Sequence, residues 1–245
     1  MHCHYCVKGE KMPNNDIKAV IFDWDNTLFP FKTYWEKSHN KVFYQNHFED
    51  LGLDYQNFIT TYRYYDKMLW KEVLLKKITL GELRQQRLIM TMRDYGIEYS
   101  SNRAQKFFED FFNQLLKEIV PENNLILAVK ELKEEYNLSI LTNGKIFEQT
   151  EKIKRSGFEG VLDTYISDQI GYEKPDIRAF QYVIKQQGLE PQTTLMVGDS
   201  YDNDLKPAHE LGMKTAYIGN TSSLKTDYSF NTIMELVAFL KRGLE

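Results

Sequence analysis

The chain has 245 residues, with 31 lysines and arginines against 35 aspartates and glutamates, so its formal net charge at pH 7 is −4. This mildly acidic balance argues against a nucleic-acid binder, and 42% hydrophobic with 27% charged residues is typical of a globular protein rather than a disordered one. No stretch approaches the roughly 20 apolar residues of a membrane helix, and two cysteines are too few for a disulfide framework.

The first 16 residues are polar and show no hydrophobic period, which predicts a flexible N-terminal tail over 1–16. No basic stretch leads into an apolar one, so we expect no secretory signal and a cytoplasmic protein. Cys3 and Cys6 stand beside two histidines, but a single Cys-x-x-Cys is half of a structural zinc site. A flexible tail is therefore the preferred interpretation.

Four short apolar runs then predict buried strands: Ile17–Phe22, Leu138–Leu141, Thr194–Val197 and Thr215–Ile218. Helical patterns follow or separate the later runs, at Asp176–Gln187, Leu205–Leu211 and Thr232–Arg242. Alternation of strand and helix indicates βαβ units. The sequence thus predicts an α/β fold with a doubly wound parallel sheet.

Residues 31–120 interrupt this alternation, because they offer only long helical patterns rich in aromatic residues. Thr79 and Glu82 have the spacing of a capping box, and Gly96 and Pro121 mark the ends of helical stretches. We therefore expect a helical bundle over 31–120, inserted after the first strand of a core domain that comprises 17–30 and 121–245.

Polar residues follow the predicted strands or precede the next helix, where ligands of doubly wound sheets bind. They are Asp23 and Asp25, Thr142 and Asn143 before Gly144, Lys174 before Pro175, and Asp199 and Asp204. We expect Pro175, at a helix start, to hold Lys174 in place. The backbone at Gly144 offers amide donors to an anion.

Together these residues supply the parts that phosphoryl transfer needs. Carboxylates are the ligands that Mg²⁺ takes from proteins, and a carboxylate is also a nucleophile able to form an aspartyl phosphate. A lysine and a metal ion reduce the repulsion between such a nucleophile and a phosphate dianion.

The chain carries, in this order, the segments Asp23-x-Asp25-x-Thr27, Thr142, Lys174-Pro175 and Gly198-Asp199 to Asp204. These segments resemble the four motifs of the haloacid dehalogenase superfamily. The resemblance covers about residues 17–220 and implies a Rossmann-like core with a helical cap. Asn26 departs from the glycine that many members carry. Asn tolerates a positive φ, so we expect the turn to be kept.

The resemblance also implies the role of each residue. Asp23 would be the nucleophile and a metal ligand, and Asp25 the general acid and base, with its backbone carbonyl on the metal. Thr142 and Asn143 would bind the phosphoryl group, and Lys174 would pair with both Asp23 and that group. Asp199 would complete the Mg²⁺ site, with Asp204 beside it.

The second carboxylate favours phosphatase chemistry, because members that cleave carbon–halogen bonds lack an acid at the position of Asp25. The segment from Trp70 through Lys77-Ile78-Thr79 to Glu82-Leu83 resembles the cap of pyrimidine 5′-nucleotidases. The stretch Leu141–Gly144 equally resembles the corresponding segment of N-acylneuraminate-9-phosphatases. We expect a phosphoric monoester hydrolase acting on a nucleoside 5′-monophosphate, with a sugar-phosphate phosphatase, a phosphomutase and a non-catalytic binding protein as alternatives.

Each residue also has a simpler interpretation. Asp23 and Asp25 could be solvated turn residues, and Thr142 with Asn143 could cap the following helix. The aromatic residues of 31–120 could stack on a nucleobase, although packing is expected for most of them. They include Tyr34, Trp35, Tyr62, Tyr64, Tyr65 and Trp70. The expected partner is a small phosphomonoester, with no nucleic acid or membrane, and the protein is expected to be a monomer or homodimer.

Overall fold

The computed structural model describes residues 16–220 and 225–242, so the predicted tail, including Cys3 and Cys6, lies outside the described residues except for Asp16. The described chain folds into two compact units. Unit 1 runs up to Pro30 and resumes at Val120, and unit 2 is Phe31–Ile119.

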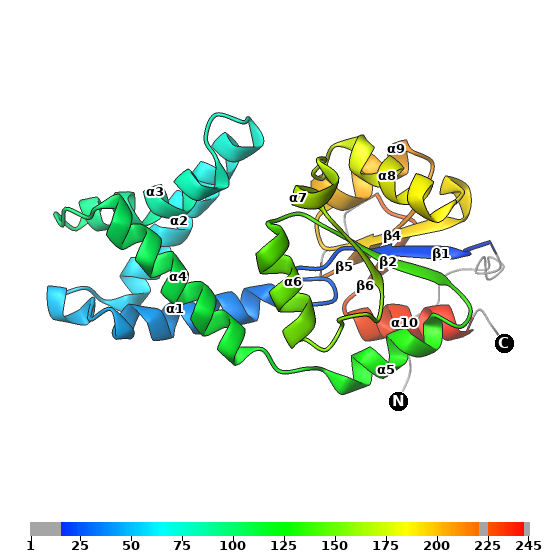
Figure 1. The fold of residues 1–245 in the computed structure, drawn as a ribbon, viewed down its shortest axis with the longest axis horizontal. Coiled ribbons are helices and arrows are strands. Elements are labelled where there is room, and N and C mark those ends of the chain that lie inside the picture. The colour runs from blue at the N-terminus through cyan, green and yellow to red at the C-terminus, as the bar shows by residue number, and fades with distance from the viewer. Residues whose placement is uncertain (1–15, 221–224, 243–245) are drawn as a thin grey trace. The chain divides into compact units, whose positions relative to one another are not determined.

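Unit 1 is built on a parallel sheet of strand order β3-β2-β1-β4-β5-β6 (Figure 1). The strands are β1 (Ala19–Phe22), β2 (Asn137–Thr142), β3 (Asp163–Ile166), β4 (Thr194–Gly198), β5 (Lys214–Ile218) and β6 (Tyr228–Phe230). This is the order of the doubly wound Rossmann sheet. The predicted fold class is therefore confirmed.

Strand β1 lies in the middle of the sheet and pairs with β2 and β4, so the carboxyl ends of these three strands are aligned. Phe22 pairs with Ile140 of β2 on one side and with Val197 of β4 on the other. The residues that follow Phe22 and Val197 therefore emerge side by side at the carboxyl edge. All four residues of β1 are buried, as the continuous apolar run predicts for a central parallel strand.

Helices cover both faces of the sheet (Figure 1). They are α5 (Asn123–Leu132), α6 (Ile146–Arg155), α7 (Ser167–Ile170), α8 (Ile177–Gln187), α9 (Lys206–Glu210) and α10 (Ile233–Arg242). In Figure 1, α8 and α9 lie on one face, and α5 and α10 on the other. Phe180 and Val183 of α8 pack with Ile21 and Met196 in one fully buried cluster.

Several boundaries differ from the sequence expectation. The edge strands β3 and β6 were not predicted, because Asp163–Ile166 and Tyr228–Phe230 are short, incompletely buried and lack a continuous apolar run. The helix expected over 205–211 is confirmed as α9, Lys206–Glu210, and the π-helical turn Tyr201–Leu205 that leads into it was not predicted. The prediction that Pro175 starts a helix is wrong, since Asp176 is the N-cap of α8 and accepts a hydrogen bond from the Arg178 amide.

Unit 2 is helical, as the aromatic-rich pattern predicts. It contains α1 (Phe31–Gln45), the 3₁₀ turn η1 (Glu49–Leu51), α2 (Tyr55–Leu74), α3 (Leu80–Asp94) and α4 (Ser101–Glu118). The capping box at the start of α3 is confirmed: Thr79 accepts from the Glu82 amide, and Glu82 accepts from the Thr79 amide.

The aromatic residues of unit 2 divide by burial. Tyr62 and Tyr65 are buried, and Tyr62 lies against Phe58 and Phe107 in the core. Tyr34 and Trp35 are half-buried. Tyr64 and Trp70, in contrast, are 64% and 41% exposed. Packing therefore accounts for only part of the set that the sequence singles out.

Within 16–220 and 225–242, none of the helices has the length and apolar character that crossing a bilayer requires.

Candidate active site

The site of unit 1 begins with the turn after β1. The Asp23 amide donates to the carbonyl of Val197 at 2.8 Å, so this residue still follows the line of the strand. Its carboxylate accepts a hydrogen bond from the hydroxyl of Thr27 at 3.1 Å on Oδ2. Asn26 has φ of 65°, which confirms that the turn needs a residue tolerant of the left-handed region.

Lys174 is a buried lysine that joins two carboxylates. Its Nζ lies 2.6 Å from Asp23 Oδ1 and 2.6 Å from Asp204 Oδ1, and its side chain is 3% exposed. A buried ammonium is stable only when opposite charges compensate for its lost hydration. Burial lowers the pKa of Lys174, but the carboxylates of Asp204 and Asp23 outweigh burial and raise the pKa above its usual value. Lys174 is therefore positively charged.

Asn143, rather than a proline at a helix start, fixes the backbone of Lys174. The Asn143 side chain donates from Nδ2 to the Lys174 carbonyl at 2.7 Å and accepts on Oδ1 from the Lys174 amide at 2.8 Å. Both polar atoms of this side chain are thus engaged inside the protein. These two bonds give Asn143 a positioning contact to the Lys174 backbone, and the expected contact of Asn143 with substrate stays a prediction.

The loop after β4 supplies two more carboxylates. Asp204 is buried and accepts on Oδ2 from the Ser200 amide at 3.1 Å. A Cβ added at Gly198 would lie 2.6 Å from Asp204 Cγ, closer than atoms can pack. Glycine at this strand end therefore makes room for the Asp204 carboxylate beside the sheet.

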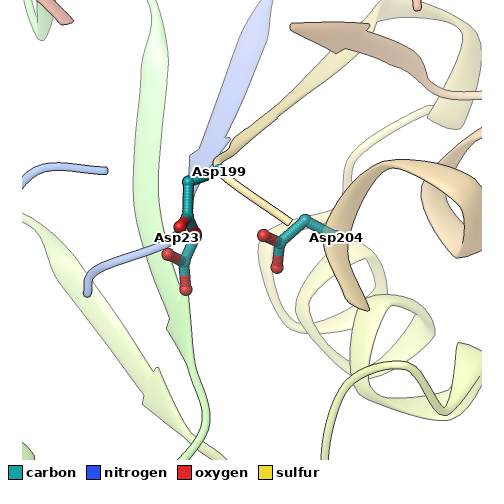
Figure 2. Close-up of side chains that lie close together, drawn as sticks. All are labelled: Asp23, Asp199 and Asp204. Atoms are coloured by element: carbon teal, nitrogen blue, oxygen red, sulfur yellow. The ribbon is translucent and has the colours of Figure 1, made fainter. Parts of the chain in front are cut away.

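Asp23, Asp199 and Asp204 form an acidic cluster in which one oxygen of each carboxylate lies within 4.8 Å of the others. Figure 2 shows their carboxylates near one another. They come from two adjacent strand ends, which explains how Asp23 meets acids that lie 176 and 181 positions later in the chain. With Lys174 as the neighbouring cation, the fully ionised cluster carries an excess of two negative charges, the charge that a divalent cation would neutralise.

Burial, reinforced by neighbouring negative charge, raises the pKa values of two acids in this cluster. Burial raises the pKa of Asp23 to about 7, with a further increase from Asp204, while Lys174 opposes the change. Burial, followed by Asp204, likewise raises the pKa of Asp199 to about 6. Perturbed carboxyls of this kind gather where proteins bind cations or perform acid–base chemistry.

Asp25 lies outside the cluster and has its own partners. Lys152 of α6 places Nζ 2.6 Å from both oxygens of the Asp25 carboxylate. Gln149, three residues earlier on the same helix, donates from Nε2 to Asp25 Oδ2 at 3.1 Å. The Asp25 side chain nevertheless remains 26% exposed, so it is accessible from solvent.

Thr142 ends β2 and is buried. Its hydroxyl oxygen accepts from Gln149 Nε2 at 2.7 Å, and its proton makes only a long contact of 3.4 Å to the carbonyl of Asn143. The helix-capping alternative is wrong, because the N-cap of α6 is Lys145. The Gly144 amide, proposed as an anion donor, donates to Ser167 Oγ at 3.0 Å.

Gln149 and Lys152 are the site residues that sequence reasoning missed. Both side chains are buried, although glutamine is polar, lysine is charged, and most residues of α6 are polar. Their spacing of three placed them on one face of α6, directly after the polar end of β2. The spacing shows that the two residues share a face, but it does not show that this face is buried at the site.

Comparison with known proteins identifies the family. The model of the haloacid dehalogenase-like hydrolases matches residues 20–218. The chain belongs to this family. The matched range contains Asp23, Asp25, Thr142, Lys174, Asp199 and Asp204.

Two curated relatives of this hydrolase cover nearly its whole length. Glyceraldehyde 3-phosphate phosphatase of Methanocaldococcus jannaschii is 27% identical over 92% of this chain and 97% of its own. Pyrimidine 5′-nucleotidase PynA of Streptococcus pneumoniae is 24% identical over 93% of this chain and 96% of its own.

Solved structures share the fold of this hydrolase. The putative hydrolase YfnB of Bacillus subtilis, solved with bound magnesium, superposes with a TM-score of 0.76 at 22% identity, over 91% of this chain and 98% of that one. Haloacid dehalogenases also have this fold. The fold alone therefore does not distinguish phosphatase from dehalogenase chemistry.

Proposed function

We propose that this hydrolase is a Mg²⁺-dependent phosphatase that cleaves a small phosphomonoester through an aspartyl phosphate on Asp23. The observation that carries the proposal is the arrangement of Asp23 against Lys174 and the other two acids, with Asp25 held separately at the same strand end. Relatives named as phosphatases, acting on a triose phosphate and on pyrimidine nucleotides, support it.

The acidic cluster fits a magnesium ion. Three carboxylates in reach of one another provide hard oxygen ligands, and the excess negative charge favours a divalent cation. Asp23, Asp199 and the nearby Asp204 would hold the ion, together with the backbone carbonyl of Asp25. When bound, Mg²⁺ would neutralise charge on the phosphoryl oxygens.

In the first half-reaction a carboxylate oxygen of Asp23 attacks phosphorus in line. The bond from phosphorus to the ester oxygen breaks as the new bond forms, and Asp25 gives its proton to the leaving alkoxide. Lys174 offsets the repulsion between the Asp23 carboxylate and the phosphate dianion. The Thr142 hydroxyl can donate to a phosphoryl oxygen, since its own oxygen already accepts from Gln149.

In the second half-reaction Asp25, now ionised, takes a proton from water. The water oxygen attacks phosphorus, the bond from phosphorus to Asp23 breaks, and inorganic phosphate leaves. One carboxyl group thus serves as acid and then as base, which returns the enzyme to its starting protonation state.

The presence of Asp25 also favours phosphatase chemistry over dehalogenase chemistry. Displacement of a halide needs no proton for the leaving group, so a general acid at this position would have no task in that step. In this chain two side chains from α6 contact the Asp25 carboxylate. This favours a reaction with a poor, oxygen leaving group.

The raised pKa values of Asp23 and Asp199 predict that Mg²⁺ binds less tightly in acid. Protons compete with the cation below the pKa values of about 7 and 6, because metal ligands must be deprotonated. Raised carboxyl pKa values also make the metal-free fold lose stability as pH rises from about 4 to about 7. The increase in Tm caused by Mg²⁺ should accordingly be larger at about pH 8 than at about pH 5.5. An equal or larger increase in Tm at about pH 5.5 would contradict this prediction. Asp199→Asn should abolish most of the increase in Tm that Mg²⁺ causes.

A nucleoside 5′-monophosphate is our proposed substrate. Trp70, in the segment that resembles nucleotidase caps, is 41% exposed, and an exposed indole face can stack on a base. The phosphatase relative that acts on glyceraldehyde 3-phosphate favours a second candidate, a small sugar or triose phosphate.

Substrate preference separates these candidates. A pyrimidine and a purine monophosphate should give a higher kcat/KM than glyceraldehyde 3-phosphate, N-acetylneuraminate 9-phosphate or glucose 6-phosphate. Stacking is worth about 1–3 kcal/mol per base, so we expect a preference of roughly tenfold to a few hundredfold.

Trp70→Ala should reduce that preference, whereas Leu74→Ala, which removes an exposed side chain without an aromatic ring from the same helix, serves as the matched control. Phosphate release measured side by side tests both statements. If a sugar or triose phosphate were the best substrate by more than about tenfold, the nucleotidase assignment would fail and the phosphatase assignment would stand.

A further inference from the structure

The face of α6 that carries Gln149 and Lys152 contacts two groups of the proposed site at once. Lys152 holds both oxygens of Asp25 at 2.6 Å, and Gln149 Nε2 lies 3.1 Å from Asp25 Oδ2 and 2.7 Å from Thr142 Oγ1. We propose that Lys152 and Gln149 are positioning residues, which orient the Asp25 carboxylate and the Thr142 hydroxyl for phosphoryl transfer. This proposal rests on the phosphatase function proposed above.

Burial makes the lysine contact specific. The Lys152 side chain is 5% exposed, and its ammonium lies 5.8 Å from the ring centroid of Phe29. Desolvating an ammonium is unfavourable unless a carboxylate compensates, so an exposed lysine would be the expected choice on this helix. Lys154, two residues later, is such an exposed residue. A lysine buried against Asp25 fixes the plane and direction of that carboxylate in its ionised form, the form that takes a proton from water in the second half-reaction.

Gln149 sets the direction of the Thr142 hydroxyl. An amide nitrogen can only donate, so the Thr142 oxygen accepts from it and the Thr142 proton points elsewhere. The same nitrogen lies 2.5 Å from the carbonyl of Asn143. Among the described residues Gln149 Oε1 is buried without a hydrogen-bond partner.

A double-mutant cycle tests the role of Lys152, because a positioning residue acts only through its partner. Lys152→Met should lower kcat for a nucleoside monophosphate by about 10- to 100-fold, less than the about 10²–10⁴ expected for losing the acid–base group itself. In an Asp25→Asn background the same change should lower kcat by less than about twofold. Lys152→Arg should recover part of the rate, and Lys154→Met is the matched control with unchanged kcat.

Thermal unfolding provides a readout that is independent of turnover. The decreases in Tm caused by Asp25→Asn and Lys152→Met should be less than additive in the double variant, since both remove one ion pair.

Several results would overturn the proposal. Equal losses of kcat from Lys152→Met in both backgrounds would show a general structural role, and an unchanged kcat in the single variant would show no role. If the unsubstituted enzyme released no phosphate from any ester, the proposed function itself would fail and the positioning role with it. An active enzyme without coupling would overturn only the positioning role.

Discussion

Replacing Asp23 with asparagine is expected to reduce phosphate release by about 10⁴-fold or more, the scale on which removal of a covalent nucleophile acts. The amide keeps the shape of the side chain and its place beside Thr27 and Lys174. It loses the negative charge and the nucleophilic oxygen, so no acyl phosphate can form. Steady-state assays with an aryl phosphate and Mg²⁺ measure the loss.

Asp202→Asn is the matched control for that experiment. Asp202 lies on the loop between Asp199 and Asp204 but is exposed and does not belong to the acidic cluster. This variant should retain the rate of the unsubstituted enzyme. Removing divalent cations with EDTA should stop phosphate release by the unsubstituted enzyme. Near-normal turnover of Asp23→Asn, or activity that survives EDTA, would mean that the reaction does not pass through Asp23 with a metal.

Asp25→Asn is expected to slow turnover of alkyl phosphates by about 10² to 10⁴, the usual contribution of a general acid–base group. An amide can neither protonate the leaving alkoxide nor accept a proton from water. Aryl phosphates have good leaving groups, so their kcat/KM, which reports the step of bond cleavage, should fall less. The contrast between the two substrate classes identifies the acid role.

Mg²⁺ binding should survive in Asp25→Asn, because the ligand expected from this residue is its backbone carbonyl. Calorimetric titration of Mg²⁺ measures this beside the rates. An unchanged rate with both substrate classes would remove Asp25 from the mechanism. Loss of Mg²⁺ binding would instead show that the side chain supports the metal site.

Most of the site could be predicted from the sequence, because strand ends in a parallel sheet converge. Asp23 and Asp199 each follow a recognisable apolar run, and β1 pairs directly with β4. The proximity of these acids thus follows from the topology. Lys174 was placed from its motif alone, and the structure gives the physical reason: Asn143 binds its backbone on both sides.

The remaining features depend on contacts that no local pattern encodes. Lys152 contacts Asp25, which lies 127 positions earlier in the chain, and nothing in the composition of α6 indicates that this lysine is buried. Strand β3 has the sequence Asp-Thr-Tyr-Ile, in which the edge position, not a run of apolar residues, produces the strand. Tertiary contacts therefore determine both the burial of Lys152 and the formation of β3.

The most direct test of the account is to locate the phosphoryl group during turnover. Asp25→Asn enzyme mixed with an aryl phosphate and Mg²⁺ should form the intermediate but hydrolyse it slowly, since the base for water is missing. Acid quenching followed by peptide mass spectrometry should then find the phosphoryl group on Asp23. Phosphate release without a modified peptide, or modification at a different residue, would contradict the aspartyl-phosphate mechanism.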